Sequence, residues 1–514
     1  MGSTTSAPAA SESSASPGNA GVQFHFDNTY SRLPDRFYAR VNPTPVAAPR
    51  LIKLNIEVAR QLGLDPEQLA SPEAVEILAG TRIAEGSQPL AIAYAGHQFG
   101  HFVPQLGDGR ANLLGEVIGR DGIRYDIQLK GSGRTRFSRG GDGRAALGSV
   151  LREYIVSEAM NAMGVPTTRS LAAVSTGDQV LRETVLPGAV LTRVASSHIR
   201  VGTFQYFAAR QDLEGVRILA DYAIDRHYPE ARESAHLYSA FLAGVVSRQA
   251  RLVAQWMLLG FIHGVMNTDN TSISGETIDY GPCAFMEAYN PDTVFSSIDR
   301  GGRYAYGNQG GIALWNLMRL AECLLPLLQQ EFGTEQAGLD HAREVLAAFE
   351  PQFEQAYHAG LRRKLGLTIE REGDADLGKD LLERMAANQA DFTLTFRRLC
   401  DAAENPDADA AVRTLFADPA AYESWAVLWR ARLQQETVSA ADRATQMRSV
   451  NPLFIPRNHL VEAALNAAVE RQDFQPFEEL LSVVLTPYQD KPGFERYSTP
   501  ALPEERVCAT FCGT

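Results

Sequence analysis

The sequence predicts an α+β protein with two lobes, a β-rich N-terminal lobe followed by a larger helical lobe. Three observations support this. Strand-like alternation is concentrated between about residues 90 and 195, and helical periodicity dominates from about residue 200 onward. The polar segments whose side chains are best suited to chemistry lie where the strand-rich region meets the helix-rich region. We therefore divide the chain into 1–22, a disordered tail; 23–195, an N-terminal extension and lobe; 196–450, a helical lobe; and 451–514, C-terminal helices and a cysteine-containing tail.

Bulk composition sets limits on the kind of protein. The 514 residues are 45% hydrophobic and 21% charged, as in ordinary globular chains, and the net charge of −13 argues against a nucleic-acid partner. No run of eighteen apolar residues occurs, so no membrane span is expected. Residues 1–22 are rich in Ser, Ala, Pro and Gly and lack the basic start and apolar centre of a signal peptide. We therefore expect a cytoplasmic protein with neither nucleic acid nor membrane as partner.

The N-terminal lobe is predicted to contain short helices and a hairpin. The segment PEQLASPEAVEILAG has the pattern of a helix pair that stops at Gly80. RDGI at 120–123 is a turn signal between two strand-like runs. In the second run, Tyr125, Ile127 and Leu129 alternate with polar residues, which places Lys130 on the polar face of the strand, toward a cleft.

Further elements follow in order. Residues 131–144 are rich in Gly and Arg and are expected to form a loop. A helix that carries Glu153 should end at Gly164, and strands return over 168–194. A buried helix leads to His263, and the region 310–430 reads as several helices.

Two segments rich in metal-ligand side chains flank a short polar run after that buried helix. HGVMNTDN ends in Asp269 and Asn270, and DYG begins with Asp279. The intervening TSISGETI is expected to form a hairpin that returns Asp279 to the same site. Asn270 and Asp279 offer the hard oxygen atoms that suit Mg²⁺, which leaves Asp269 as a base for an acceptor hydroxyl.

The order of these pieces is more informative than any one of them. Alone, a glycine turn such as Gly107–Gly109, a strand lysine or a helical glutamate has an ordinary structural explanation. Together, a Gly loop, Lys130, Glu153, Asn270 and Asp279 follow the order found in protein-kinase-like folds, which bind ATP and Mg²⁺. The usual His-Arg-Asp is missing from the catalytic loop, so the fold is predicted to be a diverged one.

Long motifs resemble the selenoprotein O family, whose bacterial members are called YdiU, over roughly 23–514. The motifs are YAGHQFGHFVPQLGDGRANLLGE, LKGSGRTRFSRGGDGRAALGSVLREY, HGVMNTDN, DYGPCAFM and NPLFIPRNHLVE. The resemblance implies a diverged kinase-like fold that transfers AMP from ATP to Ser, Thr or Tyr hydroxyls of proteins and releases pyrophosphate.

The resemblance also implies roles for individual residues. Lys130 and Arg193 would hold the terminal phosphates, with Glu153 orienting Lys130, and Asp269 would be the general base. Mg²⁺ or Mn²⁺ would be held by Asn270 and Asp279. The remaining nucleotide contacts would come from Gly107, Gly109, Arg110, Asp142, Gly143, Arg200 and Asp279.

The cysteines suggest a redox pair. Animal members of the family carry a selenocysteine near the C-terminus, and here Cys512 stands near that end. We hypothesise that Cys512 pairs with Cys283 and restrains the tail across the active site. The alternative is a pair of exposed thiols, Cys508 and Cys512, on a flexible tail.

Four functions stay open at this stage: AMP transfer to protein hydroxyls, UMP transfer from UTP with Mn²⁺, conventional phosphorylation, and nucleotide binding without catalysis. The sequence names neither the target proteins nor the oligomeric state.

Overall fold

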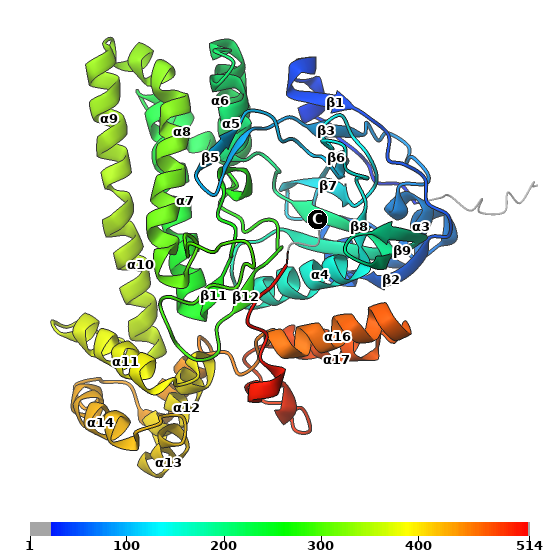
Figure 1. Cartoon of the computed structure of the whole chain (residues 1–514). Coiled ribbons are helices and arrows are strands. Elements are labelled where there is room, and N and C mark those ends of the chain that lie inside the picture. The colour runs from blue at the N-terminus through cyan, green and yellow to red at the C-terminus, as the bar shows by residue number, and fades with distance from the viewer. Residues whose placement is uncertain (1–21, 512–514) are drawn as a thin grey trace, which may run out of the picture.

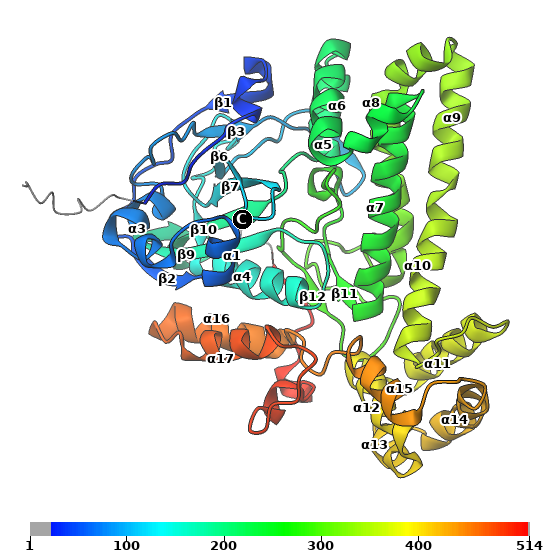
Figure 2. The same cartoon turned by 180° about the vertical axis from the view of Figure 1, so that it is seen from behind.

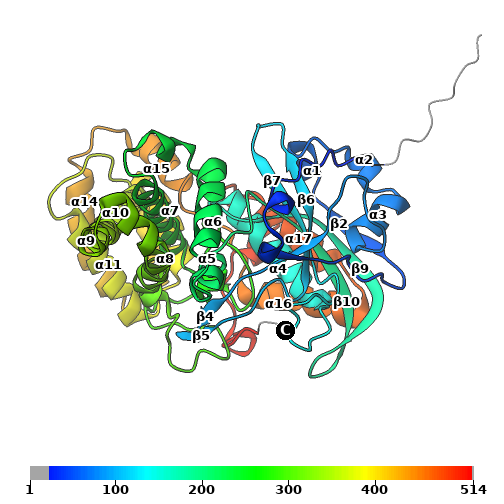
Figure 3. The same ribbon diagram turned by 90° about the horizontal axis from the view of Figure 1, so that it is seen from above.

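A computed structural model describes residues 22–511 and shows a sheet-containing half beside a helical half (Figure 1). The α+β class is therefore confirmed. The predicted disordered tail lies outside the described residues except for Val22, which is already buried. Figure 3 shows the two halves side by side, with the sheet on one side and the long helices α7, α8 and α10 on the other.

The main sheet is antiparallel and has the strand order β1-β3-β6-β7-β10-β9-β2, with β8 paired to β10. Its strands are β1 (Tyr38–Arg40), β2 (Arg50–Leu54), β3 (Leu90–Ile92), β6 (Ala111–Ile118), β7 (Arg124–Lys130), β8 (Ala145–Ala146), β9 (Arg169–Leu181) and β10 (Val185–Ala195). The predicted hairpin is confirmed as β6–β7. Two small sheets stand apart: β4 (Gly96–Gln98) with β5 (His101–Val103), and β11 (Phe261–Ile262) with β12 (Ala284–Phe285).

Helices cover both faces of this sheet. On one face lie α1 (Ile56–Gln61), α2 (Pro66–Leu69) and α3 (Pro72–Ala79), whose apolar residues form a core with the strands. The helix pair and its stop at Gly80, which has φ +81°, are as predicted. On the other face lies α4 (Leu147–Ala162), backed by α16 (Asn458–Arg471) and α17 (Gln475–Val484) (Figure 2). Because α4 is covered on both sides, it is buried almost throughout.

The helical half continues the chain from the last sheet strand. Its helices are α5 (Val201–Ala208), α6 (Leu213–His227), α7 (Leu237–Leu259), α8 (Gln309–Phe332), α9 (Glu335–Ala347), α10 (Phe349–Lys364), α11 (Asp374–Asn388), α12 (Phe392–Glu404), α13 (Asp409–Arg413), α14 (Pro419–Leu433) and α15 (Ala440–Arg448). One segment of the described chain, 306–332, is long and apolar enough to cross a membrane, with mean hydropathy 1.4. Its α8 packs against α7 and α9 and supplies core residues, as a core helix does.

One detail differs from the sequence expectations. TSISGETI does not form two paired strands, although it contains a turn in which Gly275 N–H donates to the Ser272 carbonyl at 3.3 Å. Instead Ile273 N–H donates to the Ile199 carbonyl, and Thr277 N–H donates to the Pro166 carbonyl, so the segment is fastened to the sheet half. After α17, residues 495–497 and 503–505 form short 3-10 helices. The domain boundaries and the kinase-like character of the fold stay predictions.

Candidate functional site

Five side chains from five parts of the chain form one buried ionic cluster at the junction of the two halves. Lys130 ends β7, Glu153 lies in α4, Arg193 lies in β10, and Arg200 caps α5; Asp279 follows the TSISGETI segment. Lys130 Nζ lies 2.5 Å from Glu153 Oε2 and 3.0 Å from Asp279 Oδ1. The predicted lysine–glutamate pair is therefore present.

Asp279 is the centre of this cluster. Arg193 Nη1 lies 2.6 Å from its Oδ1, and Arg200 Nη1 lies 2.7 Å from its Oδ2. Burial opposes ionisation of this carboxyl, but Arg193, Lys130 and Arg200 outweigh it and hold the pKa of Asp279 well below its usual range. The carboxylate is thus charged at neutral pH and is surrounded by three cations, an arrangement that suits a site for further anions.

A second layer holds the two guanidinium groups. Gln128, two residues before Lys130 on the same strand face, accepts from Arg193 Nη2 at 2.6 Å and donates to Asp108 at 3.1 Å. Burial raises the pKa of Asp108 to about 6, although the positive charge of the nearby Arg200 acts to lower it. Sequence reasoning missed both residues. The polar face of β7, which the sequence predicted to face a cleft, is buried against this network. Asp108 lies between Gly107 and Gly109 in the sequence.

Asp269 is joined to the cluster through its backbone. Arg200 Nη1 donates to the Asp269 carbonyl at 2.7 Å, which holds the HGVMNTDN loop close to Asp279. The Asp269 carboxylate is buried. Its Oδ2 accepts from Gln98 Nε2 at 3.2 Å, and its Oδ1 has no hydrogen-bond partner among the described residues. Burial raises its pKa to about 6.

The Gly107–Gly109 turn lies against the Gly/Arg-rich loop. Thr135 Oγ1 donates to the Asp108 carbonyl at 2.6 Å, and the Phe137 ring fills the space beside Gly107. A Cβ at Gly107 would lie 2.3 Å from that ring, so the close approach requires glycine. The Gly107–Gly109 turn and the 131–144 loop therefore pack together as one unit.

A small cleft opens beside the cluster. Arg110, Lys130, Glu153, Gly281 and Phe511 are among the residues that line it. Arg110 thus lines the same cleft as Lys130 and Glu153, and its contact with the nucleotide stays a prediction. Asp142 and Gly143 are placed outside it: the Asp142 carboxylate pairs with Arg182 at 2.8 Å, toward the end of β9.

The proposed metal ligands, Asn270 and Asp279, are hard oxygen donors, but no hydrogen bond joins their side chains in this structure. Asn270 lies in a 3-10 helix, Thr268–Asn270, and its Nδ2 donates to the Val265 carbonyl at 2.9 Å. That bond turns the amide oxygen away from Val265. Within residues 22–511 no group of three or more His, Cys, Asp or Glu forms a metal cage. Two oxygens nonetheless fit Mg²⁺, which takes its other ligands from water and substrate phosphates.

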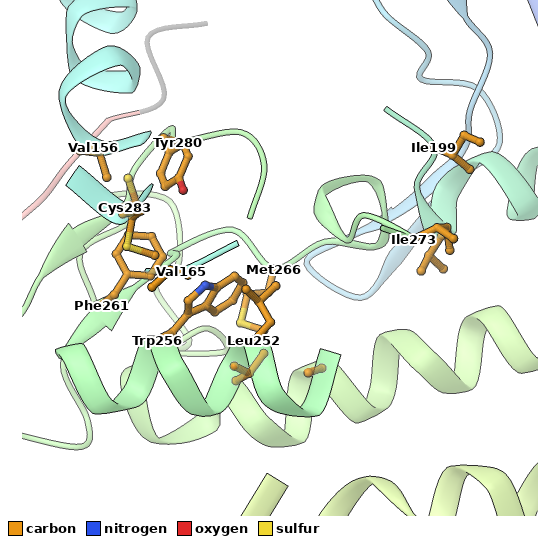
Figure 4. Close-up of a cluster of buried hydrophobic side chains, with 14 of the residues drawn as sticks. Val156, Val165, Ile199, Leu252, Trp256, Phe261, Met266, Ile273, Tyr280 and Cys283 are labelled. Atoms are coloured by element: carbon orange, nitrogen blue, oxygen red, sulfur yellow. The ribbon is translucent and has the colours of Figure 1, made fainter. Parts of the chain in front are cut away.

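Cys283 is fully buried beside Phe261 and Tyr280 (Figure 4). Burial raises the pKa of its thiol to about 11. Thr510 Oγ1 donates to the Pro282 carbonyl at 2.6 Å, so the described tail reaches the residue next to Cys283. Cys512 lies outside the described residues, and the Cys283–Cys512 pair stays a prediction.

Comparison with known proteins places the chain among the nucleotidyltransferases. A Bradyrhizobium diazoefficiens protein named "Protein nucleotidyltransferase YdiU" is 66% identical over 493 residues, or 96% of this chain and 100% of that protein. Proteins of the same name from Methylorubrum populi and Rhodopseudomonas palustris are 65% and 64% identical, each over 96% of this chain and 99% and 100% of theirs.

A family model described as "Protein adenylyltransferase SelO" matches residues 21–485. The chain belongs to this family, which confirms the resemblance read from the motifs. Membership makes a nucleotide the substrate class and nucleotide transfer the general activity.

Proposed function

We propose that this protein transfers AMP from ATP to Ser, Thr or Tyr hydroxyls of other proteins. The observation that carries the proposal is the junction cluster, in which Lys130, Arg193 and Arg200 surround Asp279, and in which Arg200 also binds the backbone carbonyl of Asp269. The order of strand lysine, helix glutamate, catalytic loop and Asp279 also favours a diverged protein-kinase-like fold.

The reaction breaks the bond between the α-phosphorus and the oxygen bridging it to the β-phosphorus. The acceptor oxygen bonds to the α-phosphorus, and pyrophosphate leaves. Lys130 and Arg193 stabilise the negative charge that develops on the leaving group, because both are held in place before the reaction by Glu153.

Asp269 takes the proton of the acceptor hydroxyl. In this structure one oxygen of the carboxylate, Oδ2, accepts from Gln98, and the other, Oδ1, is buried against Gly96 without a hydrogen-bond partner among residues 22–511. General-base help of this kind contributes on the order of 10²–10⁴ in rate. Asn270 and Asp279 would hold Mg²⁺ or Mn²⁺, which supplies electrostatic stabilisation of the phosphates when bound.

The experiment uses ATP labelled at the α- or the γ-phosphorus, and UTP labelled at the α-phosphorus, with Mg²⁺ or Mn²⁺ and a mixture of acceptor proteins. We expect α-label from ATP on protein, and its loss in Asp269→Ala. Transfer of γ-label instead would identify a kinase, and preferential transfer from UTP with Mn²⁺ would identify a uridylyltransferase. ATP binding without any transfer would leave a nucleotide-binding scaffold.

A further inference from the structure

The β4–β5 hairpin leaves the sheet half and lies on the catalytic loop (Figures 1 and 3). Three consecutive side chains of that loop each bind it. Asn267 Oδ1 accepts from Phe99 N–H at 3.0 Å, Thr268 Oγ1 accepts from His97 N–H at 2.7 Å, and Asp269 Oδ2 accepts from Gln98 Nε2. The hairpin is therefore built around the loop.

The hairpin has a second anchor that fixes where Gln98 stands. Thr268 Oγ1 donates to Gln205 Oε1 at 2.6 Å, and Gln205 Nε2 donates to His97 Nδ1 at 2.7 Å. The His97 ring also lies edge-on to Trp315 of α8, with centroids 5.2 Å apart. His97 thus has a structural role, and its neighbour Gln98 is held over Asp269.

Gly96 brings the backbone of the hairpin onto the other carboxylate oxygen. A Cβ at this position would lie 2.5 Å from Asp269 Oδ1 and 3.0 Å from its Cγ. The backbone of Gly96 has no positive φ, so the glycine is required by this close approach and not by its conformation. Any side chain at residue 96 would push the carboxylate aside.

We propose that Gln98 is a positioning residue for Asp269. Among residues 22–511, Gln98 is the only side chain that donates a hydrogen bond to this carboxylate, because Arg200 binds the Asp269 backbone carbonyl instead. By holding Oδ2, while Oδ1 packs against the Gly96 backbone, Gln98 fixes the rotation of the carboxylate. The inference rests on the proposed function, in which Asp269 is the base.

The test compares Gln98→Met with His101→Met in the full chain. Methionine keeps the length of glutamine but cannot donate a hydrogen bond. His101 is the matched control because it pairs with Gln98 in the hairpin register, is exposed and contacts neither Asp269 nor the ionic cluster. With α-labelled ATP and saturating acceptor, we expect kcat of Gln98→Met to fall about 10- to 100-fold, as when a reacting group is misplaced. The KM for ATP should stay within about twofold of wild type.

Three outcomes overturn the inference: a kcat of Gln98→Met within about twofold of wild type, an equal fall in His101→Met, or a loss that appears in the KM for ATP alone. If Gln98→Met does not fold, as judged by its melting temperature, Gln98→Glu replaces it and must show the same fall in kcat. If wild type transfers no AMP, or Asp269→Ala is fully active, the proposed function itself fails. An active wild type with an inactive Asp269→Ala and an unaffected Gln98→Met removes only the role of Gln98.

Discussion

The guanidinium group of Arg193 lies 2.6 Å from the carboxylate of Asp279, and the arginine side chain is 2% exposed. The same Nη1 atom is 3.2 Å from Glu153. The Arg193 guanidinium group therefore has two roles. It neutralises two buried carboxylates in the absence of nucleotide, and it presents a fixed positive charge to phosphate.

Replacing Arg193 by Met should therefore lower both stability and nucleotide affinity. Removing one partner of a buried pair costs about 3–5 kcal/mol, and the remaining Lys130 and Arg200 reduce this to about 2–3 kcal/mol. Thermal melts with and without ATP measure both effects. The exposed Arg120, replaced by Met, is the control. An Arg193→Met protein that melts like wild type and is stabilised equally by ATP would contradict the role of this residue.

Chelation of divalent cations should abolish transfer while leaving the fold intact. The ionic cluster is complete without a metal, because Asp279 already has three cationic partners. Asn270→Ala should shift the Mg²⁺ or Mn²⁺ dependence of transfer to higher concentration, since one of two protein oxygens is lost. Asp292→Ala, at an exposed position later in the same segment, is the matched control. Full activity of wild type in excess EDTA would contradict a metal-dependent reaction.

Much of the site could be predicted because its residues are separated by recognisable elements. The β6–β7 hairpin, the helix of Glu153 and the loop of Asp269 were each predicted from local pattern, and their order indicated a shared site. The alternation in β7 correctly grouped Lys130 with Gln128, but local pattern cannot show that a polar face is buried. That depends on Arg193, which arrives from a strand 63 residues later.

The hairpin over Asp269 could not be predicted, for a related reason. GHQFGH contains two histidines at a spacing that can bind a metal. The contact with Asp269, however, is made by Gln98, which lies between them in the sequence. TSISGETI failed as a hairpin because its hydrogen bonds go to Ile199 and Pro166, far away in sequence. In each case the deciding contact joins the two halves of the molecule.

Gly107→Ala should disrupt the packing between the Gly107–Gly109 turn and the 131–144 loop. The added methyl group would lie 2.3 Å from the Phe137 ring, and overpacking of this kind costs about 1–3 kcal/mol. We expect a higher KM for ATP. Gly140→Ala is the control, because Gly140 also has a left-handed backbone, at φ +84° against +72°, but has nothing within 4 Å of the added methyl. Equal effects of the two substitutions would show that backbone strain, and not the contact with Phe137, is responsible.

Lys364, far from the site, should make stability depend on pH. It is 3% exposed, and its Nζ lies 4.4 Å from the Phe396 ring centroid, with no carboxylate partner among residues 22–511. Burial lowers the pKa of this lysine to about 7, against an ordinary value of 10.5. Between these two pH values the unfolded chain binds more protons than the folded chain, so the stability of the native state rises with pH in this window. Below pH 7 the full cost of burying the charge is present.

Lys364→Met should therefore melt at a higher temperature than wild type below pH 7, and this advantage should shrink as the pH rises toward 10. The gain is about 1–3 kcal/mol, because the variant also loses the attraction between the cation and the aromatic rings. Lys379→Met, whose lysine side chain is 75% exposed, should show no such pH-dependent difference. Melting curves of the three proteins from pH 6 to pH 10 measure the effect. A Lys364→Met difference that is constant across this range would mean that Lys364 stays charged in the folded protein, with the rings and local solvent compensating its burial.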